Sequence, residues 1–260
     1  MKFKKLLPVL ITALATLLVI AVSLYRYFEG GAPPVADAPT VGATSSSTPK
    51  APVTPAARPS PTPTAIKGNA DFDFYVLNLS WSPDYCASSG DNDPQQCSLG
   101  KKLGFVLHGL WPQYERGYPQ HCSAVKLPAE VKAKFPNLYP SDNLYTHEWD
   151  THGTCSGLTP EGHLALSKKL KDSVAVPAPY KAPEQPVRVT TAKFKQEFVS
   201  ANPAMTADSL AVYCSGSGRF LQELYVCFSQ VGQPISCSRE IRDKGAKTCG
   251  NPDFLVRNVR

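Results

Sequence analysis

The chain has 260 residues, a formal net charge of +6 at pH 7, eight cysteines and 25 prolines. This length allows one large domain or two small ones, and it excludes no class of function by itself. Residues 1–31 hold four basic residues against one acidic residue, for +3, and residues 32–66 hold two against one, for +1. Residues 67–260 therefore carry only +2, so their bulk charge gives no reason to expect a polyanionic partner.

An uncharged, largely apolar segment from Leu6 to Tyr25 follows the first lysines. Its roughly 20 residues match the thickness of a bilayer and exceed the ~7 to 15 residues of a typical signal-peptide core. No A-x-A cleavage site ends the segment, although VADA stands at positions 35–38. We therefore expect residues 1–31 to be a signal anchor rather than a cleaved signal peptide. Either one exports the chain to the periplasm or the cell exterior, and an uncleaved anchor would hold it in the membrane through residues 6–25.

Residues 32–66 are rich in Pro, Ala, Ser and Thr and contain no aromatic side chain. Such a segment buries too little apolar area to offset its ordering entropy, which predicts a disordered, extended stalk. The folded domain is then expected at 67–260, and it holds all eight cysteines. An even number of cysteines in an exported domain indicates up to four disulfides, which can be paired in roughly 100 ways.

The predicted domain begins with two strands. Residues 71–81 alternate in hydropathy, and residues 103–110 form an apolar run typical of a buried strand. Between them, Pro83, Gly90, Pro94 and two cysteines predict a loop. The later segments predict helices at 141–153, 159–171, 191–201 and 205–214, and strands at 220–229 and 253–258. This mixed order of elements predicts an α+β domain.

Positions 147–155 read HEWDTHGTC and contain two histidines and a glutamate. On a helix, Glu148 and His152 share one face, whereas His147 and His152 are five residues apart and diverge. A zinc peptidase needs H-E-x-x-H so that both imidazoles reach one ion, so this spacing disfavours a metal site. We expect no metal or cofactor. An acid/base site in which Glu148 orients His152 fits the spacing better.

One histidine cannot accept a proton on one side of a substrate and also protonate a leaving group on the other. The second candidate is His108 in FVLHGLWPQ, at positions 105–113. A histidine in an apolar run is often only a hydrogen-bonded core residue. Packing alone, however, explains neither the glycine and tryptophan that follow His108 nor the second polar segment.

FVLHGLWPQ and HEWDTHGTC resemble the two active-site segments of the T2 family of secreted ribonucleases, whose patterns are HGLWP and HEW-x-KHGTC. WSPDYC, QHC and the C-terminal cysteines are also similar, so that the resemblance covers roughly residues 70–260. It implies an α+β domain with a central antiparallel sheet, flanking helices and disulfides. The implied activity is metal-independent endonucleolytic cleavage of single-stranded RNA through a 2′,3′-cyclic phosphate, with low base specificity.

By this resemblance His152 is the base and His108 the acid, and Glu148 with His147 holds or stabilises the phosphate. Trp111 is similar to the family's base-stacking residue, although a core or rim position explains it equally well. Tyr114 and Tyr118 follow in the same loop and would extend a stacking surface, whereas Trp149 is expected to anchor the packing of its helix.

One departure concerns Thr151, which stands where the family pattern has lysine. A hydroxyl supplies no positive charge, so turnover is expected to be lower unless another cation replaces the lysine. One alternative is therefore a catalytically weakened RNA-binding or toxin-like member of the same fold. A zinc hydrolase is a separate alternative that does not depend on Thr151. His121 and His163 match no motif and are expected at the surface, and a monomer is expected. The resemblance implies four disulfides: Cys86–Cys97, Cys122–Cys155, Cys214–Cys249 and Cys227–Cys237.

Overall fold

The computed structural model describes residues 71–89 and 92–260. The predicted anchor or signal segment at 1–31 and the predicted stalk at 32–66 lie outside the described residues. Among the helices of the described part, none combines the length and the hydropathy that a bilayer-spanning helix requires.

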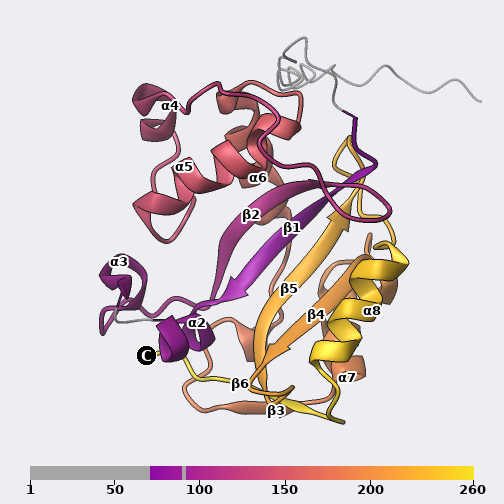
Figure 1. Ribbon diagram of the computed structural model, residues 1–260. Coiled ribbons are helices and arrows are strands. Elements are labelled where there is room, and N and C mark those ends of the chain that lie inside the picture. The colour runs from indigo at the N-terminus through magenta and orange to yellow at the C-terminus, as the bar shows by residue number, and fades with distance from the viewer. Residues whose placement is uncertain (1–70, 90–91) are drawn as a thin grey trace, which may run out of the picture. The chain divides into compact units, whose positions relative to one another are not determined.

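A six-stranded sheet forms the centre of the described domain (Figure 1). Its strands are β1 (Phe74–Trp81), β2 (Phe105–Gln113), β3 (Val187–Val189), β4 (Leu210–Ser215), β5 (Phe220–Phe228) and β6 (Phe254–Val256). The order is β2-β1-β5-β6-β3, and β4 also pairs with β5. The pairs are antiparallel except β5 with β6. Because a helix connects β5 to β6, the chain crosses over and these two strands run parallel; the other pairs form the antiparallel sheet that the resemblance implied.

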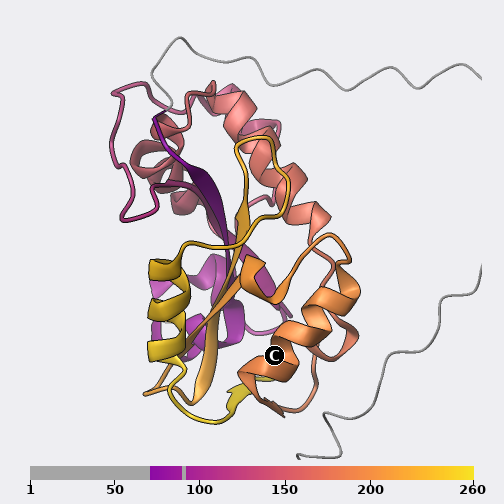
Figure 2. The ribbon, with the colours of Figure 1, turned by 90° about the vertical axis from the view of Figure 1, so that its right-hand side faces the viewer.

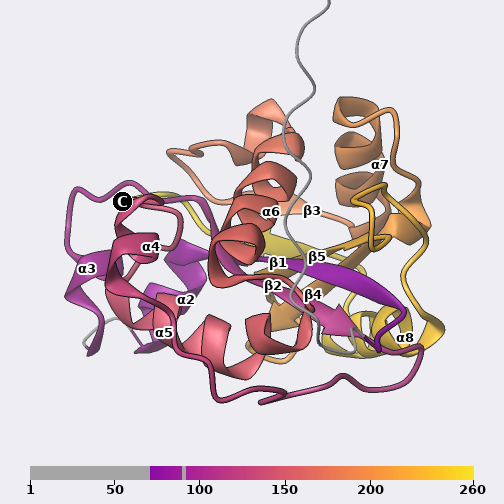
Figure 3. The ribbon, with the colours of Figure 1, turned by 90° about the horizontal axis from the view of Figure 1, so that it is seen from above.

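Helices cover both faces of the sheet. They are α2 (Ser82–Ser89), α3 (Pro94–Cys97), α4 (Ala129–Ala133), α5 (Asp142–Thr151), α6 (Pro160–Ser173), α7 (Thr191–Ala201) and α8 (Arg239–Thr248), with short 3-10 turns at Gly153–Cys155, Ala178–Tyr180 and Ala207–Ser209. Figure 2 shows α6 and α7 on one side of the sheet and α8 on the other. Helix α5 lies beside β2 when the domain is seen from above (Figure 3). The predicted α+β class is confirmed.

The alternation along β1 separates a core face from a functional face. Its odd-numbered side chains, Tyr75 to Trp81, enter the large core that includes α6 and α7. Phe74 and Val76 point to the opposite face and join the smaller core beneath α8. Asn78 and Ser80 continue this second face with polar side chains. The face therefore changes from apolar packing to a polar site within four residues.

Two predicted segments differ in the structure. The loop predicted after β1 contains α2 and α3, because its prolines stand in first helical turns, where a missing N–H costs nothing. The helix predicted at 205–214 is wrong, since residues 210–214 belong to strand β4. Leu210 and Val212 pack in the large core while Ala211 faces the smaller one, and a short run that is apolar on both faces fits a buried strand. The elements α4, β3 and α8 were not predicted.

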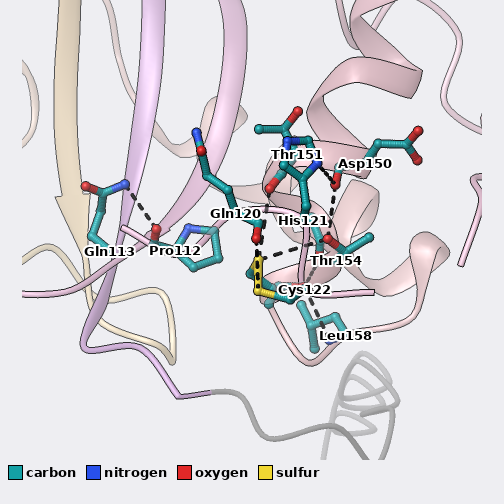
Figure 4. Close-up of a disulfide and its surroundings, with 12 residues drawn as sticks. Pro112, Gln113, Gln120, His121, Cys122, Asp150, Thr151, Thr154 and Leu158 are labelled. Atoms are coloured by element: carbon teal, nitrogen blue, oxygen red, sulfur yellow. Dashed lines mark hydrogen bonds between the residues drawn. A yellow bond between two sulfur atoms is a disulfide. The ribbon is translucent and has the colours of Figure 1, made fainter. Parts of the chain in front are cut away.

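Four disulfides staple the domain, and they join the same pairs that the resemblance implied: Cys86–Cys97, Cys122–Cys155, Cys214–Cys249 and Cys227–Cys237. The Cys122–Cys155 bridge ties the loop after β2 to the segment after α5 (Figure 4). Beside it, the backbone N–H of His121 donates to the carbonyl of Thr151 at 2.9 Å. The C-terminal end of α5 is thus held by a covalent bond and by a backbone hydrogen bond.

Candidate active site

A β-bulge places His108 on the polar face of the sheet. Asn78 lies opposite Gly109 and Leu79 lies opposite Leu107, so His108 is the extra residue in β2. This insertion lets Leu107 and Leu110, three residues apart, both enter the large core. It also turns His108 to the side of Asn78, with which its ring is in contact. A bulge that redirects a side chain in this way is common beside active sites.

Glu148 reaches the same place from α5. Its side chain is only 1% exposed, and its Oε2 accepts a hydrogen bond of 2.6 Å from Nε1 of Trp111. A Cβ atom at Gly109 would lie 2.0 Å from Oε2 of Glu148 and 2.2 Å from Nε1 of Trp111. Only glycine therefore lets the helix carboxylate come this close to the strand.

The second oxygen of Glu148 faces two imidazoles. Its Oε1 lies 3.7 Å from Nε2 of His108 and 4.0 Å from Nε2 of His147, and no group among residues 71–89 and 92–260 hydrogen-bonds to it. Burial raises the pKa of Glu148 to about 7, although the nearby His108 and the Trp111 hydrogen bond oppose the shift. Near neutral pH this carboxyl therefore exchanges between a charged acceptor and a neutral donor.

The other ring nitrogen of His108 contacts a carboxylate that the sequence did not single out. Its Nδ1 lies 2.9 Å from Oε1 of Glu223 on β5. Burial lowers the pKa of His108, but the hydrogen bond to Glu223 and the charges of Glu148 and Glu223 outweigh it and raise this pKa above its ordinary value. Glu223 is distant in sequence from both motifs. The one signal that could have identified it is a charged residue within a largely apolar strand.

His152 lies at the end of α5 in a different environment. It is 8% exposed, and its ring centroid is 5.0 Å from that of Trp111 and 5.9 Å from that of Tyr118. Burial, together with the nearby His147 and His108, lowers its pKa to about 3. The ring is therefore neutral over most of the pH range, and its buried Nδ1 has no hydrogen-bond partner in the described structure.

The expected pairing of Glu148 with His152 is not observed. Although the two residues are four apart, the carboxylate contacts Trp111, His108 and His147. The two residues are instead joined through the backbone, where the N–H of His152 donates to the carbonyl of Glu148 at 3.0 Å. The reason is that α5 ends at Thr151, so that His152 caps the helix and leaves its regular face.

Two hollows flank this group of residues. One, of about 610 Å³, is lined in part by Ser80, Tyr85, His108, Asn143 and His147. The other, of about 270 Å³, is lined in part by Trp111, Tyr114, Tyr118, His152, Tyr225 and Lys244. The polar group of His108, Glu148 and His152 thus has a binding space on each side.

Of the remaining candidates, Trp149 is a packing residue as predicted, 1% exposed, and its Nε1 donates to the carbonyl of Val125 at 2.7 Å. His121 is exposed, also as predicted. The prediction for His163 is wrong, because it is fully buried on α6. Its edge packs against Gly153, and its ring centroid lies 5.9 Å from that of Trp149.

Thr151 is buried, and its hydroxyl replaces the ammonium of the family pattern. Lys244 is the basic side chain of the hollow beside His152, and it pairs with Glu240 at 2.5 Å. Next to Glu148, the raised pKa of His108 favours a positively charged ring 3.7 Å away. In residues 71–89 and 92–260, no group of three His, Cys, Asp or Glu side chains has the arrangement of a metal site.

Comparisons with known proteins match this fold and these motifs. The sequence model of the Ribonuclease T2 family matches residues 72–237. A ribonuclease from Aeromonas hydrophila is 39% identical over 206 residues, which cover 75% of this chain and 90% of that protein. Ribonuclease I from Escherichia coli strain K12 is 24% identical over 232 residues, covering 71% of this chain and 86% of its own. The chain therefore belongs to the ribonuclease T2 family.

Solved structures show the same fold. A mutant of RNase MC1 in complex with 5′-UMP superposes with a TM-score of 0.55 at 20% identity, over 70% of this chain and 97% of that one. Trichomaglin, an S-like ribonuclease, superposes with a TM-score of 0.54 at 21% identity, over 64% of this chain and 92% of its own.

Proposed function

We propose that the protein is an exported endoribonuclease that cleaves single-stranded RNA by acid/base transphosphorylation with low base specificity. In the first step the ribose 2′-oxygen attacks phosphorus, the bond from phosphorus to the 5′-oxygen breaks, and a 2′,3′-cyclic phosphate forms. Water then opens the ring. The observation that supports this proposal most strongly is that His108 and His152 flank Glu148 and Trp111 with opposite preferences for a proton.

In this proposal His152 removes the proton from the 2′-hydroxyl. A base must start neutral, and the pKa of about 3 keeps His152 neutral in the free protein. Its ring lies against Trp111, beside the hollow of about 270 Å³ that would hold the nucleoside carrying the attacking hydroxyl.

His108 is the acid that protonates the departing 5′-oxygen. An acid must start protonated, and the raised pKa of His108 favours that form. Its exposed side opens into the hollow of about 610 Å³, which would hold the leaving nucleoside. In the second step the two roles are exchanged, because His108 is now neutral and His152 carries the proton.

Glu148 and His147 bind the phosphoryl oxygens. Below its pKa of about 7, Glu148 is a neutral donor whose Oε1 has no hydrogen-bond partner in the described part of the chain, so it hydrogen-bonds to a phosphoryl oxygen without repelling it. His147, 4.0 Å from this oxygen, adds positive charge when protonated. Donors that are already in position stabilise the charge that develops on the pentacoordinate phosphorus.

Low base specificity follows from the aromatic lining. Trp111, Tyr114 and Tyr118 lie around the hollow beside His152, and stacking on an aromatic ring contributes ~1 to 3 kcal/mol for any base. Because Nε1 of Trp111 is bound to Glu148, the indole plane is fixed before the base arrives.

The experiment is digestion of a dinucleoside phosphate by the oxidised full chain in excess EDTA. The proposal expects a 2′,3′-cyclic phosphate product that is absent with His108→Ala and with His152→Ala. Activity that disappears with EDTA and returns with zinc would support the zinc hydrolase instead. Retained cleavage in both alanine variants would refute the acid/base pair.

The alternative, a weakened RNA-binding member of the fold, rests on Thr151. It is tested with Thr151→Lys and, as a control of similar length without charge, Thr151→Met. If the missing ammonium limits turnover, the lysine variant should exceed the methionine variant by about 10-fold in kcat. RNA binding without cleavage by the folded wild-type protein would favour the alternative.

Export, membrane attachment and a monomeric state complete the proposal. Four disulfides support an oxidising compartment, and the apolar segment from Leu6 to Tyr25 would provide export and a membrane anchor. N-terminal sequencing of the mature protein distinguishes the anchor from a cleaved signal peptide. Light scattering of the detergent-solubilised chain tests the monomer.

A further inference from the structure

A second carboxylate, Glu223, lies inside the site on the side of His108 that faces away from Glu148. It stands on β5 directly opposite Ser80 of β1, and its side chain is 15% exposed. A carboxylate in the middle of a sheet is costly to bury unless several hydrogen bonds compensate it. Its partners therefore show what the position requires.

Three donors converge on one oxygen of Glu223. Oε1 accepts from Nδ2 of Asn78 at 2.9 Å, from the hydroxyl of Ser80 at 3.2 Å, and lies 2.9 Å from Nδ1 of His108. Nδ2 of Asn78 and the hydroxyl of Ser80 also lie 3.0 and 3.2 Å from this Nδ1, but both already donate to Glu223. Because a carboxylate only accepts, its approach to Nδ1 favours a hydrogen on Nδ1. The nitrogen that gains and loses a proton is then Nε2, which lies 3.7 Å from Oε1 of Glu148.

We propose that Glu223 is the positioning residue of the acid. Its carboxylate fixes the Nδ1–H tautomer of His108 and directs Nε2 with its proton to the departing 5′-oxygen. Asn78 and Ser80 in turn hold the carboxylate in place. The inference rests on the proposed function, because it assigns the acid step to His108.

The charges around His108 make Glu223 the main counterion. The facing groups on α5 are Glu148, His147 and His152; of these, Glu148 is neutral below about pH 7 and His152 above about pH 3. Burial raises the pKa of Glu223, but its hydrogen bond to His108, the charge of His108, and hydrogen bonds from Asn78 and Ser80 outweigh burial and lower it. Glu223 therefore remains an anion while His108 is protonated.

The test compares two substrates in Glu223→Gln, which keeps the shape and removes the charge. A dinucleoside phosphate needs the acid, whereas uridine 3′-(4-nitrophenyl phosphate) has a leaving group that departs without a proton. We expect kcat/KM to fall by about 100-fold for the first and by less than about 3-fold for the second. The alkaline limb for the dinucleoside phosphate should move to lower pH by about one unit.

Equal losses for both substrates, or no loss for either, would overturn the inference. Glu197→Gln is the control, since it removes a partly buried carboxylate that accepts from Tyr180 far from the site; it should change neither rate. Nitrogen NMR of the wild-type His108 ring gives a second readout that does not depend on the variant folding. A neutral Nε2–H tautomer would also overturn the inference.

The proposed function fails separately. It fails if the wild-type chain cleaves neither substrate, or if His108→Ala cleaves the dinucleoside phosphate at the wild-type rate. Wild-type cleavage that depends on His108 but not on Glu223 would leave the proposed function intact and reject only the positioning role.

Discussion

His108 and His152 both lie against Trp111, with ring centroids 5.2 and 5.0 Å from that of the indole, and their surroundings determine how activity should depend on pH. The acid works while His108 is protonated, so kcat/KM should fall as pH rises through its raised pKa, above the ordinary value of about 6.5. The base works while His152 is neutral, so activity should fall on the acid side only near its pKa of about 3. We expect a broad bell with an acidic to neutral plateau, measured as kcat/KM for a dinucleoside phosphate.

Glu148 adds a feature to this profile. As it loses its proton near pH 7, the phosphate loses a donor, so the decline should begin there and be milder in Glu148→Gln. A profile that stays flat from about pH 4 to about pH 9 would contradict the acid assignment, and one with no fall near pH 3 would contradict the base assignment.

The buried side chain of His163 should make the stability of the fold depend on pH in the acidic range. Its folded pKa of about 4 is below that of an exposed histidine, so the unfolded chain binds more protons as pH falls. The stability that the neutral ring contributes is complete above about pH 6.5 and is lost as pH falls toward 4, by up to about 3 kcal/mol. Urea unfolding of the wild type and of His163→Phe at pH 7 and pH 4.5 should show a smaller loss in the variant.

Equal losses on acidification in both proteins would contradict this role of His163. His121→Phe is the control, because His121 is exposed and its replacement should leave the difference between the two pH values unchanged.

At the residue level, the sequence identified the residues that stand inside motifs. His108, Trp111, His147, Glu148 and His152 came from two short segments, and the fold brings all five together. Glu223 was missed because its contact with His108 spans 115 positions. That contact also depends on the bulge in β2, and no local pattern reports the pairing register of a strand.

At the level of elements, the Cys122–Cys155 bridge should matter more for activity than its stability contribution implies. It closes a segment of 33 residues, and Cys214–Cys249 closes one of 35, so removal of either should destabilise the fold by a similar ~4 kcal/mol. The first bridge, however, holds the end of α5, where His152 lies. We expect the double serine variant at 122 and 155 to lose more kcat than the one at 214 and 249.

The comparison is made at a temperature at which both variants are folded, by circular dichroism and steady-state kinetics. An equal loss of kcat in the two variants would show that the bridge acts only through global stability.

A helix or strand was predicted correctly where the spacing of its apolar residues fitted only one of the two structures. The helix α7 was predicted at its observed bounds, because Phe194 and Phe198 are four apart and both buried, and Thr190 caps its first turn. Strand β4 was predicted as a helix, because its core contacts lie on both faces and leave no period of two. Strand β3 has only three residues, and its pairing with β6 rather than its own sequence makes it a strand.

At the level of the whole molecule, the two faces of the sheet have different structural roles. One face buries the large core with α6 and α7. The other combines a small core beneath α8 with the polar group around His108. A site with buried charged groups needs a rigid surrounding structure. The disulfides provide this rigidity, provided that the chain folds in an oxidising compartment.

The state of the eight cysteines should therefore report where the chain folds. We expect the full chain, expressed in bacteria, to resist thiol alkylation until it is reduced, and to cleave RNA. A chain that starts at residue 32 lacks the segment from Leu6 to Tyr25 and should remain in the cytoplasm with reactive thiols and little activity. Fusion of this shorter chain to an unrelated signal peptide should restore both properties. A shorter chain that is oxidised and active in the cytoplasm would show that the fold does not require export.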